Sequence, residues 1–326
     1  MTEFRTRPYA EGDAAAVAAL MNAVEVDAGG SPFFTDADIR RVVDARVRDL
    51  ASDSRLTVAL DGTLVAAGFV VPPPDGGSRA DTLGGVHPLW QGRGLGHALL
   101  DWQIKRLSGL HDEIAPDARW DIEAGTLADH EGAIHLFENF DMSPARFFLE
   151  MRADLATALA ATPRPPVPEG IRVAPYTPEH VDGVYRAHMD AFADHWGFQG
   201  RAQHEWVQTT VDAPSFRPDL SRVAFDGDEV AGYVLSYDAI DDLHHIGQVG
   251  TRRPWRRRGL ASALVVDTMA AAADAGKATA TLGVDADSLT GAVGVYERVG
   301  FSVLTRFVAY RRPLGPEVLS PGASTG

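Results

Sequence analysis

The chain has 326 residues, of which 45% are hydrophobic and 23% charged, with a formal net charge of −15 and no cysteine. The length fits two domains of about 150 residues, and the lack of cysteine excludes disulfides, thiol catalysis and cysteine metal sites. The acidity argues against nucleic acid or an anionic membrane as a partner. It favours either the approach of a cationic substrate, such as an amine, or simply solubility.

No apolar run reaches the length of about 18 residues that a membrane-spanning helix needs. The N-terminus, MTEFRTRPYAEGD, has no apolar segment behind a basic start and so lacks a signal-peptide pattern. We therefore expect a cytoplasmic protein without a membrane partner, as a monomer or homodimer.

The first half predicts a strand at 4–9, a helix near 14–28 and a hairpin that turns at Asp61-Gly62. A fourth strand then runs into a glycine-rich turn and a helix. The half ends with three predicted elements: a strand at 119–124, a helix at 132–140 and a strand at 146–152.

Prolines follow at positions 163, 165, 166 and 168, a pattern that no helix or central strand accommodates. They predict an extended spacer. We place an N-terminal domain at 1–157, a linker at 158–169, a C-terminal domain at 170–314 and a flexible tail at 315–326.

The second half repeats the pattern of the first. Its elements are predicted at 171–176, 178–193, a hairpin at Asp226-Gly227, and then 279–284, 291–299 and 303–311. GVHPLWQGRGLGHALL (85–100) resembles GTRRPWRRRGLASALV (250–265), and IHLFENFDM (134–142) resembles VGVYERVGF (293–301). Two collinear matches indicate duplication of a whole domain. The order of elements predicts a mixed α/β fold (α+β) in each half.

The turn before the long helix of each half is the clearest candidate binding site. A helix N-terminus offers free N–H groups and partial positive charge, and arginine forks suit phosphate. The C-terminal turn carries Arg252, Arg253, Arg256, Arg257 and Arg258 in an otherwise acidic protein, and its counterpart is Gln91–Gly96. Glycine at 259 and 94 lets the backbone approach an anion closely.

This turn, its strand and the helix with the Tyr-x-x-x-Gly-Phe pattern resemble the GNAT N-acetyltransferase superfamily, in the tandem form of mycothiol synthase-like enzymes. The resemblance implies two domains, each with a mixed, mostly antiparallel sheet flanked by helices, and acetyl-CoA (coenzyme A) with its pyrophosphate on the turn. The implied cofactor residues of the C-terminal half are Val249, Gly250, Thr251, Arg256, Arg257, Arg258, Gly259, Leu260, Ala261 and Ser288. Those of the N-terminal half are Gln91, Gly92, Arg93, Gly94, Leu95 and Gly96.

The same resemblance assigns Tyr296 as the acid that protonates the leaving thiolate. It places an acidic base near His245, where histidine can accept a proton directly or through water. Carboxylates that compete for the role of base are Glu297, Asp285 and Asp238.

Trp196 and Phe198 lie where the family forms a wall of the acceptor pocket; ordinary loop packing is the alternative. The spacing of His188, Asp190 and His195 matches no ligand set, so we expect no metal.

The N-terminal copy carries Phe137 at the position of Tyr296 and Ala80 at that of His245, so we expect it to lack catalysis. Two roles stay open for it: binding acetyl-CoA or shaping the acceptor site. The sequence thus predicts an N-acetyltransferase for a small-molecule amine. A protein or peptide N-acetyltransferase and a non-catalytic acyl-CoA-binding protein are the alternatives.

Overall fold

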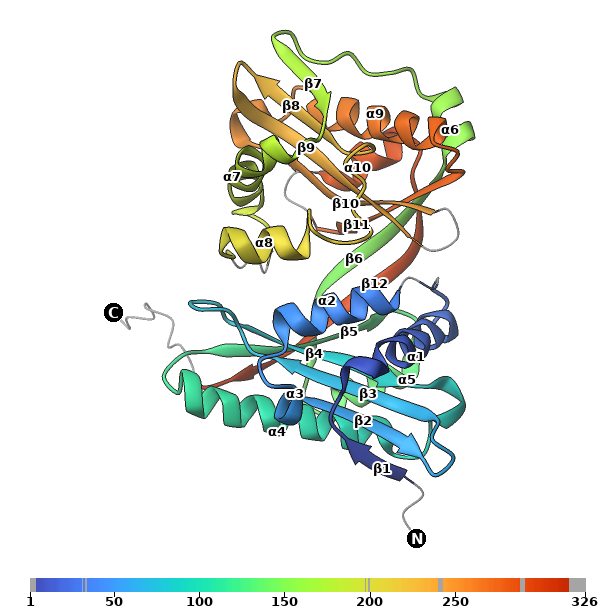
Figure 1. Ribbon diagram of the computed structural model, residues 1–326, viewed down its shortest axis with the longest axis vertical. Helices are drawn as coiled ribbons and strands as arrows, with labels where there is room; N and C mark the ends of the chain where they lie inside the picture. Colours follow the sequence, from blue (N-terminus) through green and yellow to red (C-terminus); the bar gives the residue numbers. More distant parts are fainter. Residues whose placement is uncertain are drawn as a thin grey trace, which may run out of the picture.

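The computed structural model describes residues 4–30, 32, 34–196, 198, 200–239, 243–287 and 291–316. Its two halves repeat one order of elements (Figure 1). The first half comprises β1 (Phe4–Arg7), α1 (Ala14–Asp27), α2 (Asp36–Arg46), α3 (Leu50–Asp53), β2 (Ser54–Ala59), β3 (Leu64–Val71), β4 (Arg79–Val86), α4 (Leu95–Ile114), β5 (Trp120–Leu127), α5 (Glu131–Glu138) and β6 (Ser143–Asp154). After α6 (Leu155–Ala161), the second comprises β7 (Ile171–Pro175), α7 (Val181–Phe192), α8 (Gln203–Thr209), β8 (Arg222–Asp226), β9 (Glu229–Asp238), β10 (Leu243–Thr251), α9 (Leu260–Asp274), β11 (Thr279–Asp285), α10 (Ala292–Arg298) and β12 (Ser302–Leu314).

Local chemistry explains where these elements begin and turn. Both predicted hairpins are present, and Gly62 and Gly227 adopt φ angles of 92° and 59° at their turns. Helix α2 was not predicted, although its start has a capping box. The N–H of Asp38 donates to Thr35 Oγ1 at 3.1 Å, and the N–H of Thr35 donates to Asp38 Oδ2 at 3.2 Å.

The predicted linker begins too early. Residues 158–161 belong to α6, which starts with the N–H of Thr157 donating to Asp154 Oδ1 at 2.8 Å. Leu155 and Ala158 are buried with side chains of α9, and this packing keeps the segment helical. The extended stretch is therefore the proline-rich part alone. The other domain boundaries stay a prediction, and most of the predicted tail lies outside the described residues.

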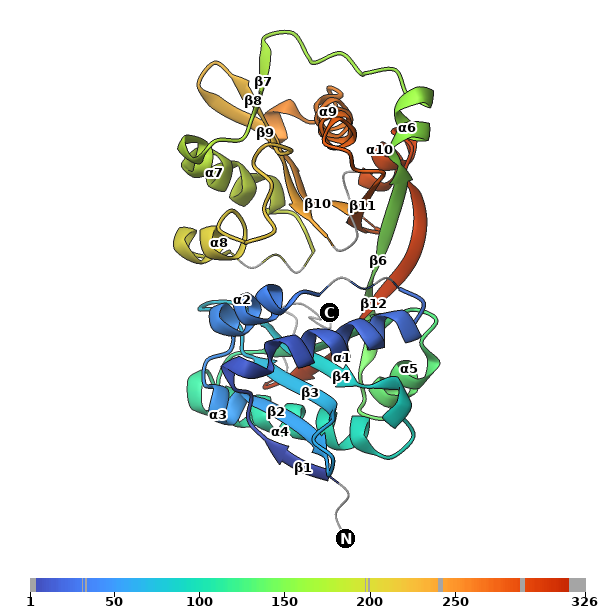
Figure 2. The ribbon, with the colours of Figure 1, turned by 45° about the vertical axis from the view of Figure 1, so that its right-hand side comes forward.

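The main feature that the sequence did not indicate is an exchange of the last strands between the halves. The twelve strands form one sheet in the order β1-β2-β3-β4-β5-β12-β6-β11-β10-β9-β8-β7. Strand β12, at the C-terminal end, pairs with β5 of the first half, and β6 of the first half pairs with β11 of the second. Figure 2 shows both strands running from one half into the other. We expected a separate sheet in each half, and the crossing strands join them.

The exchange follows a pseudo-two-fold symmetry that the strand register makes explicit. Phe148 pairs with Phe307 at the centre of the β6–β12 ladder, and their ring centroids lie 6.4 Å apart. The pairs on either side correspond, since Ser302 pairs with Arg152 just as Ser143 pairs with Arg311. A register irregularity occurs on each side of the centre as well. The two crossing strands are thus equivalent partners.

Helices cover both faces of the sheet in each half. In the first half α4 and α5 pack on one face, and α1 and α2 on the other. In the second half α9, α10 and α6 pack on one face, and α7 and α8 on the other. The halves also meet through α2 and α8, where Arg41 Nη1 donates to the carbonyl of Thr209 at 3.1 Å.

In each half the two central parallel strands pair only at their start. Strand β10 pairs with β11 from Leu243 to Ile246 and then continues to Thr251 beside β9 alone. Strand β4 pairs with β5 only from Arg79 to Asp81. The sheet therefore opens in both halves just before the glycine-containing turn.

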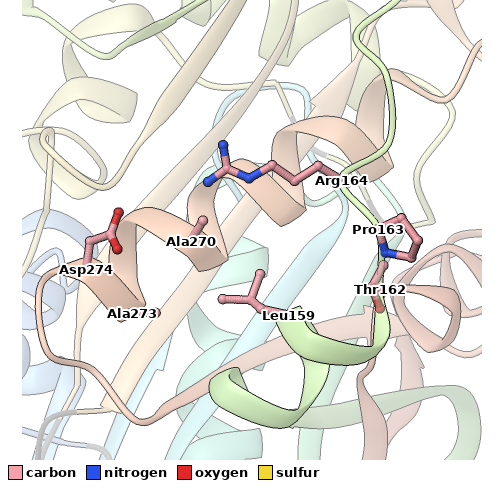
Figure 3. A pocket seen from close by; sticks show the side chains of 7 residues that line it. All are labelled: Leu159, Thr162, Pro163, Arg164, Ala270, Ala273 and Asp274. Carbon is pink, nitrogen blue, oxygen red and sulfur yellow. The ribbon is translucent and has the colours of Figure 1, made fainter.

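A hollow of about 360 Å³ lies between α6, the residues after it and α9 (Figure 3). It contains none of the predicted site residues. Its lining comprises Leu159, Thr162, Pro163, Arg164, Ala270, Ala273 and Asp274. No helix in the described part of the chain has the length and hydrophobicity to cross a bilayer.

The strand exchange predicts that a residue of the first half stabilises the second. Met151 on β6 is fully buried in the core around α9. Met151→Ala should lower the free energy of unfolding by about 2–5 kcal/mol and raise hydrogen exchange in α9. Phe147→Ala, at a position 39% exposed on the same strand, is the control. Faster hydrogen exchange that is confined to elements of the first half would contradict the strand exchange.

Candidate active site

The predicted phosphate turn has the same backbone in both halves. In the second half a short 3₁₀ turn at Arg253–Trp255 leads to Arg257 and Gly259, whose φ angles are 58° and 81°. Gly92 and Gly94 take φ angles of 71° and 78° at the corresponding places. The left-handed conformation of these residues turns the chain into the first turn of α9 and α4.

Each turn presents an open helix N-terminus. In the described residues, the backbone N–H groups of Arg257, Arg258 and Gly259 have no hydrogen-bond acceptor. Nothing lies within 4 Å of where a Cβ would stand on Gly259 or Gly94. Unpaired N–H groups beside open space, at the positive end of a fifteen-residue helix, suit an anion.

Only two of the five arginines of the C-terminal turn are available for a ligand. Arg252 pairs with Asp190 and Glu229, and Arg253 pairs with Asp194. Arg256 donates to the carbonyls of Thr251 and Ala191 at 3.1 and 2.9 Å. Its side chain therefore shapes the loop, although the sequence placed Arg256 among the residues that bind the cofactor.

Arg257 and Arg258 are exposed, and neither forms an ion pair within the described ranges. The N-terminal turn offers less charge, because Arg93 stacks on Trp90 with its guanidinium carbon 4.7 Å from the ring centroid. Gln91 Nε2 donates to Asp27 at 3.2 Å. The C-terminal turn is thus the stronger candidate for phosphate.

The strand before this turn, with the predicted Val249, Gly250 and Thr251, borders the opening. Gly250 lies against Tyr233, because a Cβ at Gly250 would be 2.3 Å from the tyrosine ring. Tyr233 is fully buried, with its hydroxyl 2.7 Å from His188 Nδ1. Any side chain at position 250 would displace this pair, so the close approach requires glycine.

His245 lies at the start of the opening. Burial lowers the pKa of its imidazole to about 4, and Nδ1 is 3.1 Å from Thr281 Oγ1. It pairs with Tyr237 on β9, on the face that α7 and α8 cover. The neighbouring Ile246 belongs to the opposite face, as alternation along a strand requires. A neutral, partly exposed imidazole on this face can accept a proton.

The structure corrects the alignment of the halves at this position. Strand β10 contains a bulge at Gly247 that β4 lacks, so β10 has one extra residue. Counting from the turn therefore matches His245 with Ala80, whereas strand pairing matches His245 with Asp81. Asp81 accepts a hydrogen bond from Arg46 and lies 3.1 Å from Arg79 Nε. The N-terminal half thus has a carboxylate at the place of the base, but two arginines neutralise it.

Tyr296 lies on α10, in the core that contains Ile246 and α9. Its ring packs 6.1 Å from that of Phe301, and burial raises the pKa of its hydroxyl to about 12. Its counterpart Phe137 packs 5.4 Å from the ring of Tyr310. Tyr296 and His245 therefore belong to opposite faces of the sheet, on either side of the opening between β10 and β11.

Two of the three carboxylates that compete with His245 for the role of base are bound by basic side chains, and the third is exposed on the surface. Arg146 binds both oxygens of buried Asp285 at 2.8 and 2.9 Å. Burial acts to raise the pKa of Asp238, but hydrogen bonds from Lys277 and Arg217 outweigh it and lower the pKa. Glu297 is exposed on α10. These contacts leave His245 as the best-placed candidate for the base.

Trp196 and Phe198 have different surroundings. Trp196 lies against the exchanged strands, with Arg311 3.9 Å and Arg146 5.8 Å from the centroid of its ring. Phe198 packs near His188 and Phe192, so its role includes ordinary packing. The partners of Trp196 could not be found from the sequence, because only the strand exchange brings β6 and β12 there. Ser288 lies outside the described residues. The described residues contain no group of three or more side chains arranged to hold a metal.

A family model described as Acetyltransferase (GNAT) family matches residues 181–301. A mycothiol acetyltransferase of Clavibacter michiganensis subsp. michiganensis is 30% identical over 255 residues, covering 77% of this chain and 78% of that relative. This chain belongs to the GNAT acetyltransferase family. The mycothiol acetyltransferase of Salinispora tropica is 28% identical over 306 residues, and the match covers 87% of this chain and 89% of that relative.

Solved GNAT structures extend the similarity to the whole chain. A GCN5-related N-acetyltransferase from Sphaerobacter thermophilus has a TM-score of 0.78 at 27% identity, over 98% of each chain. A tandem GNAT protein from the clavulanic acid biosynthesis pathway has a TM-score of 0.71 at 17% identity, over 97% of this chain and 100% of that one, and so shares the fold. As a GNAT protein, the chain is an acetyl-CoA-dependent acetyltransferase. The unpaired N–H groups and the two available arginines of the C-terminal turn fit the phosphates of this cofactor.

Replacing Arg257 and Arg258 together by Ala should weaken acetyl-CoA binding about tenfold or more, because a hydrogen bond to a charged group contributes about 1.5–3 kcal/mol. The loss should shrink at high salt, since screening weakens charge attraction. Isothermal titration calorimetry checks both. Arg5→Ala with Arg48→Ala, which removes two exposed arginines elsewhere, is the matched control. Unchanged affinity of the Arg257/Arg258 variant would remove the turn from the site.

Proposed function

We propose that the C-terminal half transfers an acetyl group to the primary amine of a small molecule, with His245 as base and Tyr296 as acid. The proposal rests on one difference between the halves. In the described residues, only the C-terminal half combines an available arginine turn, a neutral imidazole and a phenol around the sheet opening. In the same places the N-terminal half has Asp81, which is held in ion pairs with two arginines, and Phe137, which has no hydroxyl.

His245 accepts the proton of the amine. Because burial holds its pKa near 4, the imidazole is uncharged at neutral pH and does not repel a cationic acceptor. It is a weak base, so it takes the proton only as the nitrogen forms its new bond and its N–H becomes acidic. Thr281 fixes the ring through Nδ1.

Bound acetyl-CoA supplies the thioester carbonyl carbon that the amine attacks and the sulfur that leaves. Tyr296 donates its O–H toward that sulfur from the α10 side of the opening. The pKa of about 12 keeps the phenol protonated at every working pH. It also makes complete proton loss costly, so a hydrogen bond to the departing sulfur is a large part of its contribution.

Two observations support an amine as the acceptor. The relatives matched over most of their length are named mycothiol acetyltransferases, which favours a small molecule. Glu150 on β6 pairs with Gly283 on β11, two residues beyond Thr281 and on the face of His245. Burial and the charge of Glu150 raise the pKa of Glu25 on α1. Two neighbouring carboxylates on this side favour a cationic group.

A screen of small amines and of lysine-containing peptides with acetyl-CoA, read as release of free thiol, tests the function. Turnover with a small amine is the expected result, and activity confined to peptides would contradict the proposal. Gly259→Glu should abolish turnover, because a charged side chain meets the phosphate site. The matched change Gly94→Glu, at the same left-handed backbone position, should reduce turnover modestly or not at all. The reverse pattern in folded proteins would assign chemistry to the N-terminal half.

Tyr296→Phe should lower kcat about 10²–10⁴-fold, the usual contribution of a general acid. Acetyl-CoA affinity should stay nearly unchanged, since the ring and its packing are retained. Steady-state kinetics and calorimetry measure the two effects. Phe137→Tyr is the matched control and should add no activity. Wild-type turnover of Tyr296→Phe would assign the hydroxyl a structural role only.

The pKa of His245 predicts an unusual pH profile. A lowered pKa means that the proton-accepting form is fully present above about pH 5 and is lost only as the pH falls through 4. The profile of kcat/KM should therefore show no inflection near 6.5 and should rise instead with deprotonation of the acceptor amine. His245→Gln should lower kcat about 10²–10⁴-fold across the range. An inflection near 6.5 that this variant abolishes would show that the imidazole is not desolvated.

A further inference from the structure

Gln248 is a polar residue beside the sheet opening whose side chain forms no hydrogen bond with any described residue. It follows the bulge at Gly247 on β10 and pairs with Leu235 on β9. The side chain is half-buried, and its Oε1 atom is buried without a partner. An unpaired buried polar atom lowers stability, so the amide at this position calls for an explanation.

Gln248 belongs to the same face of the sheet as His245. Its partner Leu235 is fully buried in the core that α7 and α8 cover, and His245 pairs with Tyr237 on that face. The pairing of β10 with β11 ends at Ile246, so Gln248 borders the opening. Because Leu235 and Tyr237 are two residues apart on β9, strand geometry places Gln248 about 7 Å from His245 along β10.

Two tyrosine rings of β9 flank this stretch of β10. A Cβ at Gly247 would lie 2.4 Å from the ring of Tyr237, and a Cβ at Gly250 would lie 2.3 Å from the ring of Tyr233. Both rings belong to the face that α7 and α8 cover, whereas position 249 faces the core around α9. Of positions 247–250, Gln248 therefore contributes the one polar side chain to the face of the candidate base.

The N-terminal half has an apolar residue in the same place. Leu83 pairs with Phe69 on β3 as Gln248 pairs with Leu235 on β9. Leu83 and Gln248 also stand at the same distance along the chain from the glycine before the following helix. Leu83 packs against the core of α1 and α2. A leucine thus satisfies the packing at this strand position, so packing alone does not account for the glutamine.

We propose that the amide of Gln248 binds a hydrogen-bonding group of the acceptor, a hydroxyl or an amide, near the amine that His245 deprotonates. The inference rests on the proposed function. A glutamine side chain offers both a donor and an acceptor, so it can pair with either group. An alkyl group in the same place leaves the amide unpaired, and sites of this kind reject such analogues. Gln248 therefore selects polar small amines over alkyl amines.

Selectivity between matched amines, measured as kcat/KM with acetyl-CoA in excess, tests this role. Propanolamine is compared with butylamine, and β-alaninamide with isopentylamine, so that an alkyl group of similar size replaces the hydroxyl or the amide. In at least one pair, the preference of the wild type for the polar amine should exceed that of Gln248→Leu by about tenfold or more. Differences in amine basicity cancel, because the same pair is compared in two proteins. The KM for acetyl-CoA should stay unchanged.

Thermal unfolding separates this role from a structural one. Gln248→Leu should have a Tm equal to or above that of the wild type, because it removes an unpaired polar atom and introduces the residue found at Leu83. Gln103 on α4 is the matched control, since its Nε2 donates to the carbonyls of Phe69 and Leu83 at 3.0 and 2.9 Å. Gln103→Leu should lower the Tm and leave the preference for polar amines unchanged.

The inference is overturned if the wild type and Gln248→Leu show the same preference in both pairs, or if neither polar amine is acetylated. It is also overturned if Gln248→Leu lowers the Tm as Gln103→Leu does. Turnover of other small amines in any of these cases leaves the proposed function intact. Absence of turnover with every small amine would instead contradict the proposed function, and this inference with it.

Discussion

The backbone pairing of β6 with β12 is the constraint on which the rest of the structure depends. These strands join two sheets into one and place the Phe148–Phe307 pair at the pseudo-two-fold centre. They also bring Arg146 and Arg311 beside Trp196, which belongs to the loop after α7. The surroundings of Trp196 are therefore built from both halves.

Within this symmetric frame, a few local changes separate the halves. The bulge at Gly247 shifts β10 by one residue and places His245 where the other half has Asp81. Tyr296 differs from Phe137 by one ring hydroxyl. The C-terminal turn differs from the N-terminal one by two exposed arginines, Arg257 and Arg258, that are available to a ligand. The left-handed glycine turn is therefore present in both halves, while the phenol and the imidazole are found at these two positions of the C-terminal half and not at their counterparts.

The sequence predicted the repeated order of elements well, because each signal was local. Asp-Gly hairpins, apolar periodicity and glycine turns depend on neighbouring residues, and the left-handed angles at Gly94 and Gly259 agree with them. The missed features depend on distant contacts. The carboxylate partners of Arg252, Arg253 and Arg256 lie 23 to 62 residues away along the chain. The bulge in β10 shifts the alignment of the two halves that residue counting gives. The strand exchange leaves no trace in either half, since the strands themselves were correctly expected.

The exchange also has a consequence for synthesis on the ribosome. Strand β5 ends at Leu127, but its partner β12 begins only at Ser302 and ends at Leu314. At about 5–20 residues per second, the edge of β5 stays without this partner for on the order of ten seconds or longer. During that interval an open strand edge can pair with another nascent chain. The time order of translation, rather than the stability of the finished fold, thus decides when this protein is most exposed to misassembly.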